Sequence, residues 1–205
     1  MTSMRLYNKI ECPFCWKVRL ALSELGLAVE IVDHEEVARQ GEWHALSPRR
    51  TVPVLVSGDT AIYESNVILE FLQDFSGELL PKPMAQRAQA RLLNQYSDGT
   101  IGAALREVIF EKRGKPEVQW DRARIDAGVK AFHKALAYLS EQLGDREYFT
   151  DRYAFPECAL TARFGLAQAY GVDIPEDFAN LGAWFSRMKE RASYAATAPA
   201  RALAN

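Results

Sequence analysis

Two cysteines separated by two residues, in the run Cys12-Pro13-Phe14-Cys15, are the side chains of this sequence best suited to chemistry. The preceding residues predict a short strand and the following ones a helix, which places Cys12 at the helix N-terminus. Unpaired backbone N–H groups and the positive end of the helix dipole stabilise a thiolate there and lower the pKa of its thiol. Pro13 suits the first helical position because it needs no N–H partner. Cys15, about one turn along, would be close enough to attack a disulfide formed at Cys12.

The same pair can also be read as half of a metal site or as two inert core thiols. A zinc site needs a second pair of ligands, and the three histidines show no ligand spacing, so no metal is expected. The third cysteine, Cys158, lies among Ala and Leu residues and is expected in the core. An odd number of cysteines does not make a disulfide framework. Redox or thiol-transfer chemistry at Cys12 and Cys15 is therefore favoured over metal binding.

Two further short motifs have ordinary explanations when each is taken alone. Pro53, in Val52-Pro53-Val54, interrupts a strand-like run and must lie at an edge, a bulge or the beginning of the strand. A cis bond at Pro53 would turn the backbone groups of Val52 outward, where an extended peptide can pair with them. Glu64-Ser65 opens a predicted helix, where a hydroxyl and free N–H groups suit a carboxylate and an acidic side chain suits an amine. Taken alone, edge-strand proline and helix capping explain them.

The elements that position these motifs alternate between strand and helix in the first part of the chain. Strands are predicted at 4–8, 28–32, 51–56 and 60–63, with a turn at Gly58-Asp59. Apolar residues at steps of three and four predict a helix after Pro13 that ends at Gly26, and another that begins at Glu64-Ser65. A polar stretch from 34 to 46 has weak helical character. This pattern predicts an α/β domain ending near residues 76–77.

The rest of the chain has no persuasive strand pattern. Two prolines at 81 and 83 indicate a linker, followed by a long helical segment at 84–113 that is bent or loosened around Gly99 and Gly102. Further helices are predicted around 125–143, at 156–170 and around 178–188. The helix at 156–170 is apolar nearly all round, which is typical of a helix at the centre of a domain.

Composition narrows the class of protein. The 205 residues carry a formal net charge of −2, which gives no electrostatic reason to expect a nucleic acid partner. No signal peptide pattern is visible, and no stretch approaches the ~20 apolar residues of a membrane helix. We therefore expect a soluble, cytoplasmic protein with no membrane partner.

In their order along the chain, the three motifs become specific. A strand, Cys-Pro-Phe-Cys and a helix, then Val-Pro about forty residues on and Glu-Ser about ten later, resemble the thioredoxin-like domain of the cytosolic glutathione transferases. The closing segment at 190–194 is also similar to that family. The resemblance implies an α/β thioredoxin-like domain at 1–77, a linker at 78–85 and an all-helical domain at 86–205. It also implies a homodimer.

The resemblance assigns roles to residues through the shape of glutathione, the expected co-substrate. Pro53 would be the cis-proline and Val52 would pair with the cysteinyl unit through its backbone. Glu64 and Ser65 would hold the γ-glutamyl amine and carboxylate, and Phe14 would pack beside the site. The glycyl carboxylate would be reached by an arginine, either Arg39 or Arg50.

Cysteine at the reactive position implies thiol transfer more than conjugation. Conventional transferases use a Tyr or Ser hydroxyl, whereas Cys12 can form a mixed disulfide with glutathione and reduce disulfide or dehydroascorbate-type substrates, as in the omega class. Cys15 would be an optional resolving thiol, as in the related two-domain glutaredoxins. Two alternatives stay open: conjugation to electrophiles, and a non-enzymatic protein similar to stringent starvation protein A, which binds RNA polymerase. Tyr7 is expected to be a packing residue.

Two features of the helical half accompany this resemblance. The family caps its central helix with a hydroxyl residue, but Ala154 stands there in the run Ala154-Phe155-Pro156-Glu157, a change that costs about 1 kcal/mol at a helix start. Thr150, Asp151 or Pro156 could offset the loss. The second substrate would lie between the domains, against apolar walls. Core packing explains the aromatic residues of this region equally well, but four of them could contribute to these walls: Trp43, Phe110, Trp120 and Tyr170.

Overall fold

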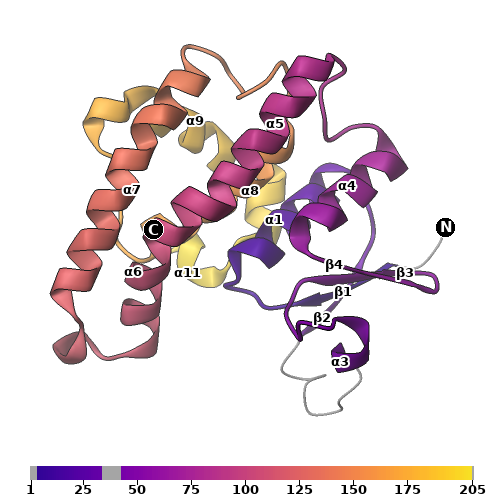
Figure 1. Ribbon diagram of the computed structural model, residues 1–205, viewed down its shortest axis with the longest axis horizontal. Coiled ribbons are helices and arrows are strands. Elements are labelled where there is room, and N and C mark those ends of the chain that lie inside the picture. Colours follow the sequence, from indigo (N-terminus) through magenta and orange to yellow (C-terminus); the bar gives the residue numbers. More distant parts are fainter. Residues whose placement is uncertain (1–3, 34–42, 205) are drawn as a thin grey trace.

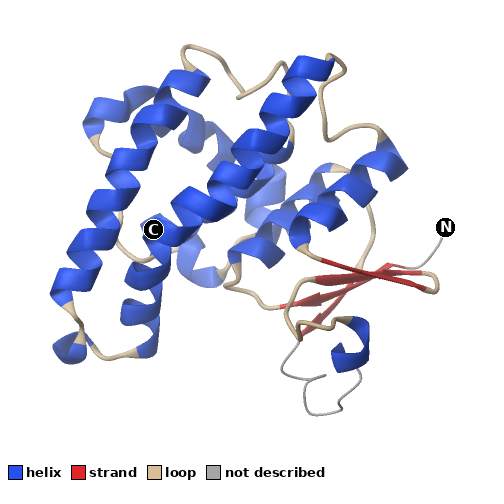
Figure 2. Ribbon diagram, viewed as in Figure 1, coloured by secondary structure: helices blue, strands red, loops and turns tan. Residues whose placement is uncertain are grey.

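A computed structural model describes residues 4–33 and 43–204 of the chain. A small mixed sheet with its helices forms one part, and a larger group of helices packs beside it (Figure 1). Figure 2 shows the strands confined to one end of the molecule and helices in the rest. The predicted fold class, an α/β domain followed by helices, is confirmed. In the described part of the chain, none of the helices is long and apolar enough to cross a membrane.

The sheet has the strand order β2-β1-β3-β4 within the described residues. Its strands are β1 (Met4–Asn8), β2 (Glu30–Asp33), β3 (Val54–Ser57) and β4 (Thr60–Tyr63). β1 runs parallel to β2 and antiparallel to β3, and β3 and β4 form an antiparallel hairpin. β3 begins later than predicted, because Pro53 has no N–H to donate and the ladder starts only after it. The Val52–Pro53 bond is cis.

Three helices accompany the sheet: α1 (Pro13–Glu24), α3 (Trp43–Leu46) and α4 (Ser65–Ser76). α1 and α4 lie over one face of the sheet, and α3 lies on the other side (Figure 1). The predicted stop after α1 is observed, since Gly26 has a φ of 61°, a left-handed conformation that favours glycine. The predicted weak helix at 34–46 is present at its end as α3, and residues 34–42 lie outside the described part.

The helical part begins inside the predicted linker, at Met84. Its helices are α5 (Met84–Tyr96), α6 (Gly102–Gly114), α7 (Arg122–Leu143), α8 (Phe155–Ala169), α9 (Ala179–Lys189), α10 (Ala192–Thr197) and α11 (Ala200–Leu203). A π-helical segment, Ser97–Ile101, joins α5 to α6 where loosening was predicted, and short 3₁₀ turns stand at Glu117–Gln119 and Glu176–Phe178. Neither α10 nor α11 was predicted from the sequence. Both are short, and α10 packs against α1 instead of showing a periodicity of its own.

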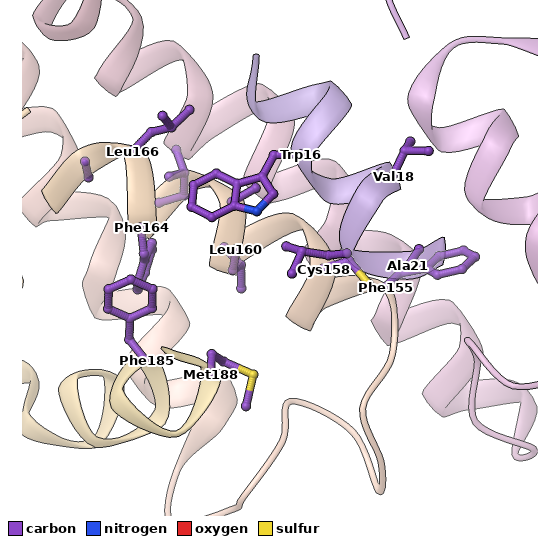
Figure 3. Close-up of a cluster of buried hydrophobic side chains, with 14 of the residues drawn as sticks. Trp16, Val18, Ala21, Phe155, Cys158, Leu160, Phe164, Leu166, Phe185 and Met188 are labelled. Atoms are coloured by element: carbon purple, nitrogen blue, oxygen red, sulfur yellow. The ribbon is translucent and has the colours of Figure 1, made fainter. Parts of the chain in front are cut away.

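One continuous core joins the two parts of the molecule, with α1 packed against α8. Figure 3 shows this cluster, in which Trp16 of α1 lies among apolar side chains of α8 and α9. Trp16 is fully buried, its ring centroid is 5.4 Å from that of Tyr194, and its Nε1–H donates to Thr197 Oγ1 at 3.0 Å. Because α1 also carries Cys12 at its N-terminus, this packing fixes the reactive end of the helix relative to the helical part.

The start of α8 is capped by Glu157, and Pro156 lies in its first turn, where a missing N–H is tolerated. The Glu157 carboxylate accepts the backbone N–H groups of Ala154 at 2.9 Å and Phe149 at 2.8 Å. Thr150 does not substitute for the missing cap hydroxyl, because its hydroxyl donates to the carbonyl of Arg152. Burial raises the pKa of Glu157 to about 7, although both backbone donors favour the carboxylate.

Gly165 is expected to be intolerant of a side chain. A Cβ at Gly165 would overlap the buried ring of Trp16 and lie 3.2 Å from the hydroxyl of Tyr194. Replacing Gly165 by alanine should lower the free energy of unfolding by about 1–3 kcal/mol, as overpacking does, measured by denaturant titration. Gly182→Ala is the control, because a Cβ at Gly182 meets nothing within 4 Å and alanine favours a helix. Equal effects of the two substitutions would contradict this account of the α1–α8 contact.

Candidate functional site

The strand register brings the three sequence motifs to one end of the sheet. Tyr7 of β1 is opposite Val54 of β3, and Val54 is in turn opposite Tyr63 of β4. Just beyond this row the chain leaves β1 toward Cys12, enters β3 from Pro53 and leaves β4 at Glu64. Motifs that are forty residues apart in sequence therefore share a single edge. Tyr7 itself is buried and packs with Val54, as predicted.

Cys12 occupies the N-cap position of α1, with Pro13 as the first helical residue. The thiol of Cys15 donates a hydrogen bond to the sulfur of Cys12, which is the largest influence on the Cys12 thiol and lowers its pKa to about 6. Burial opposes this shift. Backbone N–H groups of Cys15 and Phe14 and the positive charge of Arg163 add to it. The predicted environment of a helix-terminal thiolate is therefore present.

Cys15 lies behind Cys12 and is completely buried. Burial raises the pKa of the Cys15 thiol well above its usual range, and the hydrogen bond to Cys12 raises it further. The backbone N–H of Lys9 donates to the Cys15 sulfur at 3.4 Å. Cys15 thus holds its proton as a donor toward Cys12 while Cys12 is the thiolate, and it is a poor nucleophile in this state.

Glu64, the first residue after β4, has an unusual backbone conformation. Glu64 has a φ of 65°, although it is not glycine, and stands at the N-cap of α4. Such left-handed geometry costs of order 1–3 kcal/mol in non-glycine residues and clusters at functional sites. The Glu64 carboxylate accepts from Arg49 Nη1 at 3.0 Å, and Ser65 is buried as the first residue of α4.

Of the other residues predicted to contact glutathione, only some are found near Cys12. Phe14 lies at the site, with the guanidinium of Arg163 4.5 Å from its ring centroid. Arg50 is exposed and has a left-handed φ of 52°, and it is the neighbouring Arg49 that pairs with Glu64. Arg39 lies outside the described residues.

Three charged residues near Cys12 were not predicted from the sequence. Asp98, in the π-helical segment, pairs with Lys17 of α1 at 2.5 Å and with Arg163 of α8 at 3.3 Å. The side chains of Lys17 and Arg163 are only 1% and 8% exposed, so Asp98 compensates two cations away from water. Lys17 also donates to Asn66 at 2.5 Å, which ties the cluster to α4.

The sequence contains part of the information needed to predict this charged cluster. Arg163 is a charged residue within a helix that is apolar nearly all round, and such residues need a buried partner. The partner could not be found by spacing, because 65 positions separate it from Asp98. The π-helical geometry that aims Asp98 inward often marks functional sites, but only the loosening at Gly99 and Gly102 is visible in the sequence.

A cleft of about 600 Å³ opens over Cys12 between the turn after β1 and α6. Phe14, Ile109 and Phe110 provide apolar surface, and Arg163 and Asp98 lie at its base with Cys12. Of the aromatic residues suggested for the second substrate, Phe110 lines this cleft. Tyr170 stands behind it, where its hydroxyl donates to Glu11 at 2.6 Å.

Trp120 is not among the residues that line this cleft in the described part of the chain. The ring of Trp120 lies between the side chains of Lys112 and Arg122, at 5.5 and 5.1 Å. The side chain of Trp43 lies outside the described part of the structure.

Comparison with known proteins identifies relatives along most of the chain. The family model "Glutathione S-transferase, N-terminal domain" matches residues 6–78. Glutathione S-transferase 1 of Dianthus caryophyllus is 30% identical over 181 residues, which span 81% of this chain and 81% of that protein. Maleylacetoacetate isomerase of Mus musculus is 27% identical over 169 residues, 78% of each chain.

Solved structures have the same fold. A glutathione S-transferase from Rhodospirillum rubrum F11 superposes with a TM-score of 0.83 at 30% identity, covering 93% of this chain and 90% of that one. A glutathione S-transferase from Methylobacterium radiotolerans, in complex with glutathione sulfonate, gives a TM-score of 0.79 at 27% identity over 97% and 95% of the two chains. Sequence and fold agree over both parts of the molecule, and the chain belongs to the glutathione S-transferase family.

Proposed function

We propose that this protein catalyses glutathione-dependent thiol transfer, with Cys12 as the nucleophile. The observation that carries the proposal is the position of Cys12 at the N-terminus of α1, with Cys15 as a hydrogen-bond donor behind it. A hydroxyl at this place would stabilise the glutathione thiolate, whereas a thiolate can itself attack sulfur. The role of glutathione as co-substrate is supported by family membership and by the glutathione sulfonate complex of the Methylobacterium radiotolerans relative.

The reaction follows from a thiolate at Cys12. Its sulfur attacks the glutathione sulfur of a mixed disulfide, and the electron pair of the broken S–S bond leaves on the substrate sulfur, which takes up a proton. A second glutathione thiolate then attacks the glutathione sulfur bonded to Cys12. This releases glutathione disulfide and restores the Cys12 thiolate, so one free glutathione thiol is the reductant and the other half of the disulfide comes from the substrate.

The sheet edge supplies the groups proposed to hold glutathione. The backbone of Val52, next to the cis bond at Pro53, would pair with the cysteinyl unit. Ser65 and the free N–H groups of the first turn of α4 would hold the γ-glutamyl carboxylate, and Glu64 the amine. For the glycyl carboxylate, Arg50 is the candidate within the described residues.

Cys15 is assigned a supporting role, because burial keeps it protonated. The proposed route therefore uses Cys12 alone with two glutathione molecules. The dithiol route, with Cys15 resolving the mixed disulfide, requires deprotonation of a buried thiol and is expected to be slower.

Conjugation of glutathione to electrophiles is the second candidate, favoured by the apolar wall of Phe14, Ile109 and Phe110 in the cleft. A homodimer also remains a proposal. An exposed groove between α4 and α5, which includes Val67 and Leu92, is the candidate face, to be tested by light scattering. The cytoplasmic location stays a prediction from the sequence.

The first test is the pH dependence of Cys12 alkylation. Reactivity toward iodoacetamide should reach half its maximum near pH 6, because the thiolate forms as pH rises through the lowered pKa of about 6. Cys15→Ala should move this midpoint upward, since it removes the hydrogen bond with the largest effect. Cys15→Ser should move it less, because serine can still donate. Intact mass spectrometry reads the single adduct, which should be absent in Cys12→Ser.

Incubation with glutathione disulfide supplies the matching chemical test. One glutathionyl adduct should form on Cys12 and be removed by added glutathione. A midpoint at the ordinary pKa of a free thiol, together with no adduct, would refute thiol transfer at Cys12 and favour the conjugation or non-enzymatic readings.

A further inference from the structure

The cleft over Cys12 is rich in basic side chains although the chain as a whole carries a net charge of −2. Four basic residues line it against two acidic ones, Glu11 and Asp98. A cleft lined mainly by one sign of charge focuses the potential inside it and concentrates ligands of the opposite sign. The cleft is therefore biased toward anions.

Both acidic residues of the cleft are already engaged. Asp98 is held by Lys17 and Arg163 at its base. Glu11 accepts a hydrogen bond from Tyr170 and lies 3.6 Å from Arg201 and 3.9 Å from Arg113. Arg113 and Arg163 of the lining thus take part in pairing these carboxylates, but Lys17 and Arg201, outside the lining, share that pairing, so the cleft keeps an excess of positive charge.

One face of α6 presents an aromatic ring between two guanidinium groups. Arg106, Phe110 and Arg113 recur at steps of four and three, which places them on one side of the helix. The guanidinium carbons lie 5.7 Å and 5.3 Å from the Phe110 ring centroid. Phe110 is 50% exposed, and the nearest carboxylate to Arg106 is that of Glu107, at 4.0 Å. An apolar platform with a cation on each side thus faces the cleft.

We propose that the second substrate is an organic anion with a flat apolar body, its carboxylate or sulfonate paired with Arg106 and Arg113 and its ring on Phe110. This inference rests on the proposed function, in which glutathione occupies the sheet edge and the cleft receives its reaction partner. The carboxylates of glutathione are met at the sheet edge, which leaves the α6 arginines to select the partner. Arginine suits this task because its planar fork both stacks on rings and binds carboxylates.

Binding tests the inference without requiring turnover. Calorimetry of the full-length protein with naphthalene-2-carboxylate and its neutral carboxamide should show the carboxylate binding about tenfold more tightly, the scale of two partly exposed ion pairs. Raised salt should reduce this preference. In Arg106→Gln/Arg113→Gln the two probes should bind alike, and the neutral probe should keep its affinity.

Arg122→Gln is the matched control. Arg122 also stacks on an aromatic ring, at 5.1 Å from Trp120, and pairs with a carboxylate, Glu117 at 2.8 Å, but it lies outside the cleft. It should leave the tenfold preference intact. Equal affinity of both probes for the unmodified protein, or loss of the preference in Arg122→Gln, would overturn the inference.

Turnover separates this inference from the proposed function. Glutathione mixed disulfides of 5-thio-2-nitrobenzoate and of neutral 4-nitrothiophenol differ in the carboxylate, and both release a coloured aryl thiolate when Cys12 takes the glutathionyl group. We expect higher kcat/KM for the carboxylated substrate, lost in the double arginine variant. Turnover of both with no preference would overturn the anion selectivity alone. No turnover of either, with carboxylate-selective binding intact, would overturn thiol transfer alone.

Discussion

Replacing Cys12 by serine is expected to lower the rate of glutathione-dependent disulfide reduction by about a thousandfold or more, the scale on which removal of a nucleophile acts. A serine hydroxyl has no counterpart of the thiolate that forms near pH 6 and does not form a disulfide. The measurement is the release of aryl thiolate from a glutathione mixed disulfide, coupled to the consumption of glutathione.

Two cysteine variants make this loss interpretable. Cys158→Ser changes a buried thiol whose sulfur lies 3.5 Å from the Tyr153 hydroxyl, away from the cleft, and controls for the general removal of a cysteine. Cys15→Ser should retain a substantial part of the rate, because serine can donate to Cys12 and no resolving thiol is required. If Cys15→Ser were as inactive as Cys12→Ser, the dithiol route would replace the one proposed here.

The same variant also separates the two candidate reactions. A serine at position 12 can still stabilise the thiolate of bound glutathione, as hydroxyl transferases do, so Cys12→Ser should retain or gain conjugation to an electrophile such as 1-chloro-2,4-dinitrobenzene. Retained disulfide reduction together with lost conjugation would contradict the assignment of Cys12 as a sulfur nucleophile.

Local chemistry made a large part of this site predictable from the sequence. Pro13 and Gly26 mark the two ends of α1, and the hydrophobic spacing between them fixes its buried face. With β1 before it, Cys12 could only fall at the N-terminus. The interruption of the strand at Pro53 and the helix start at Ser65 are equally local signals. The order of the three motifs along the chain indicated the glutathione transferase family.

The remaining part of the site depends on contacts between distant segments. Lys17, Asp98 and Arg163 come from α1, the π-helical segment and α8, and their pairing exists only once the helices have packed. The capping of α8 shows the same limit: the missing hydroxyl at Ala154 was visible, but Glu157 also reaches back to Phe149, eight residues earlier. Short-range sequence patterns indicate the propensity for helix or strand, whereas the partners of buried polar groups are determined by tertiary structure.

Replacing Asp98 by alanine is expected to have the largest effect on stability. It leaves the cations of Lys17 and Arg163 buried without their carboxylate, and breaking a buried ion pair in this way costs about 3–5 kcal/mol. Chemical denaturation at neutral pH, followed by tryptophan fluorescence, measures the loss. Glu117→Ala provides the comparison, because it removes an exposed partner of Arg122 and should change stability by less than about 1 kcal/mol.

A second substitution identifies the cause of that loss. Lys17→Met removes one uncompensated cation while keeping an unbranched apolar side chain, so Asp98→Ala/Lys17→Met should recover part of the stability lost in Asp98→Ala. A double variant less stable than Asp98→Ala would show that the buried charges are not the source.

The reactive thiol should respond to the same change. In Asp98→Ala, Arg163 loses its carboxylate partner and keeps Cys12 as an anionic neighbour. The positive charge of Arg163, which already favours the Cys12 thiolate, is then no longer partly neutralised by Asp98. The pKa of Cys12 should therefore fall below about 6, and the alkylation midpoint should move to lower pH as overall stability falls. General loosening of the fold would instead hydrate the thiol and weaken its hydrogen bond to Cys15, which moves the midpoint upward. The direction of this shift decides whether Asp98 acts on Cys12 through Arg163 or only supports the packing around it.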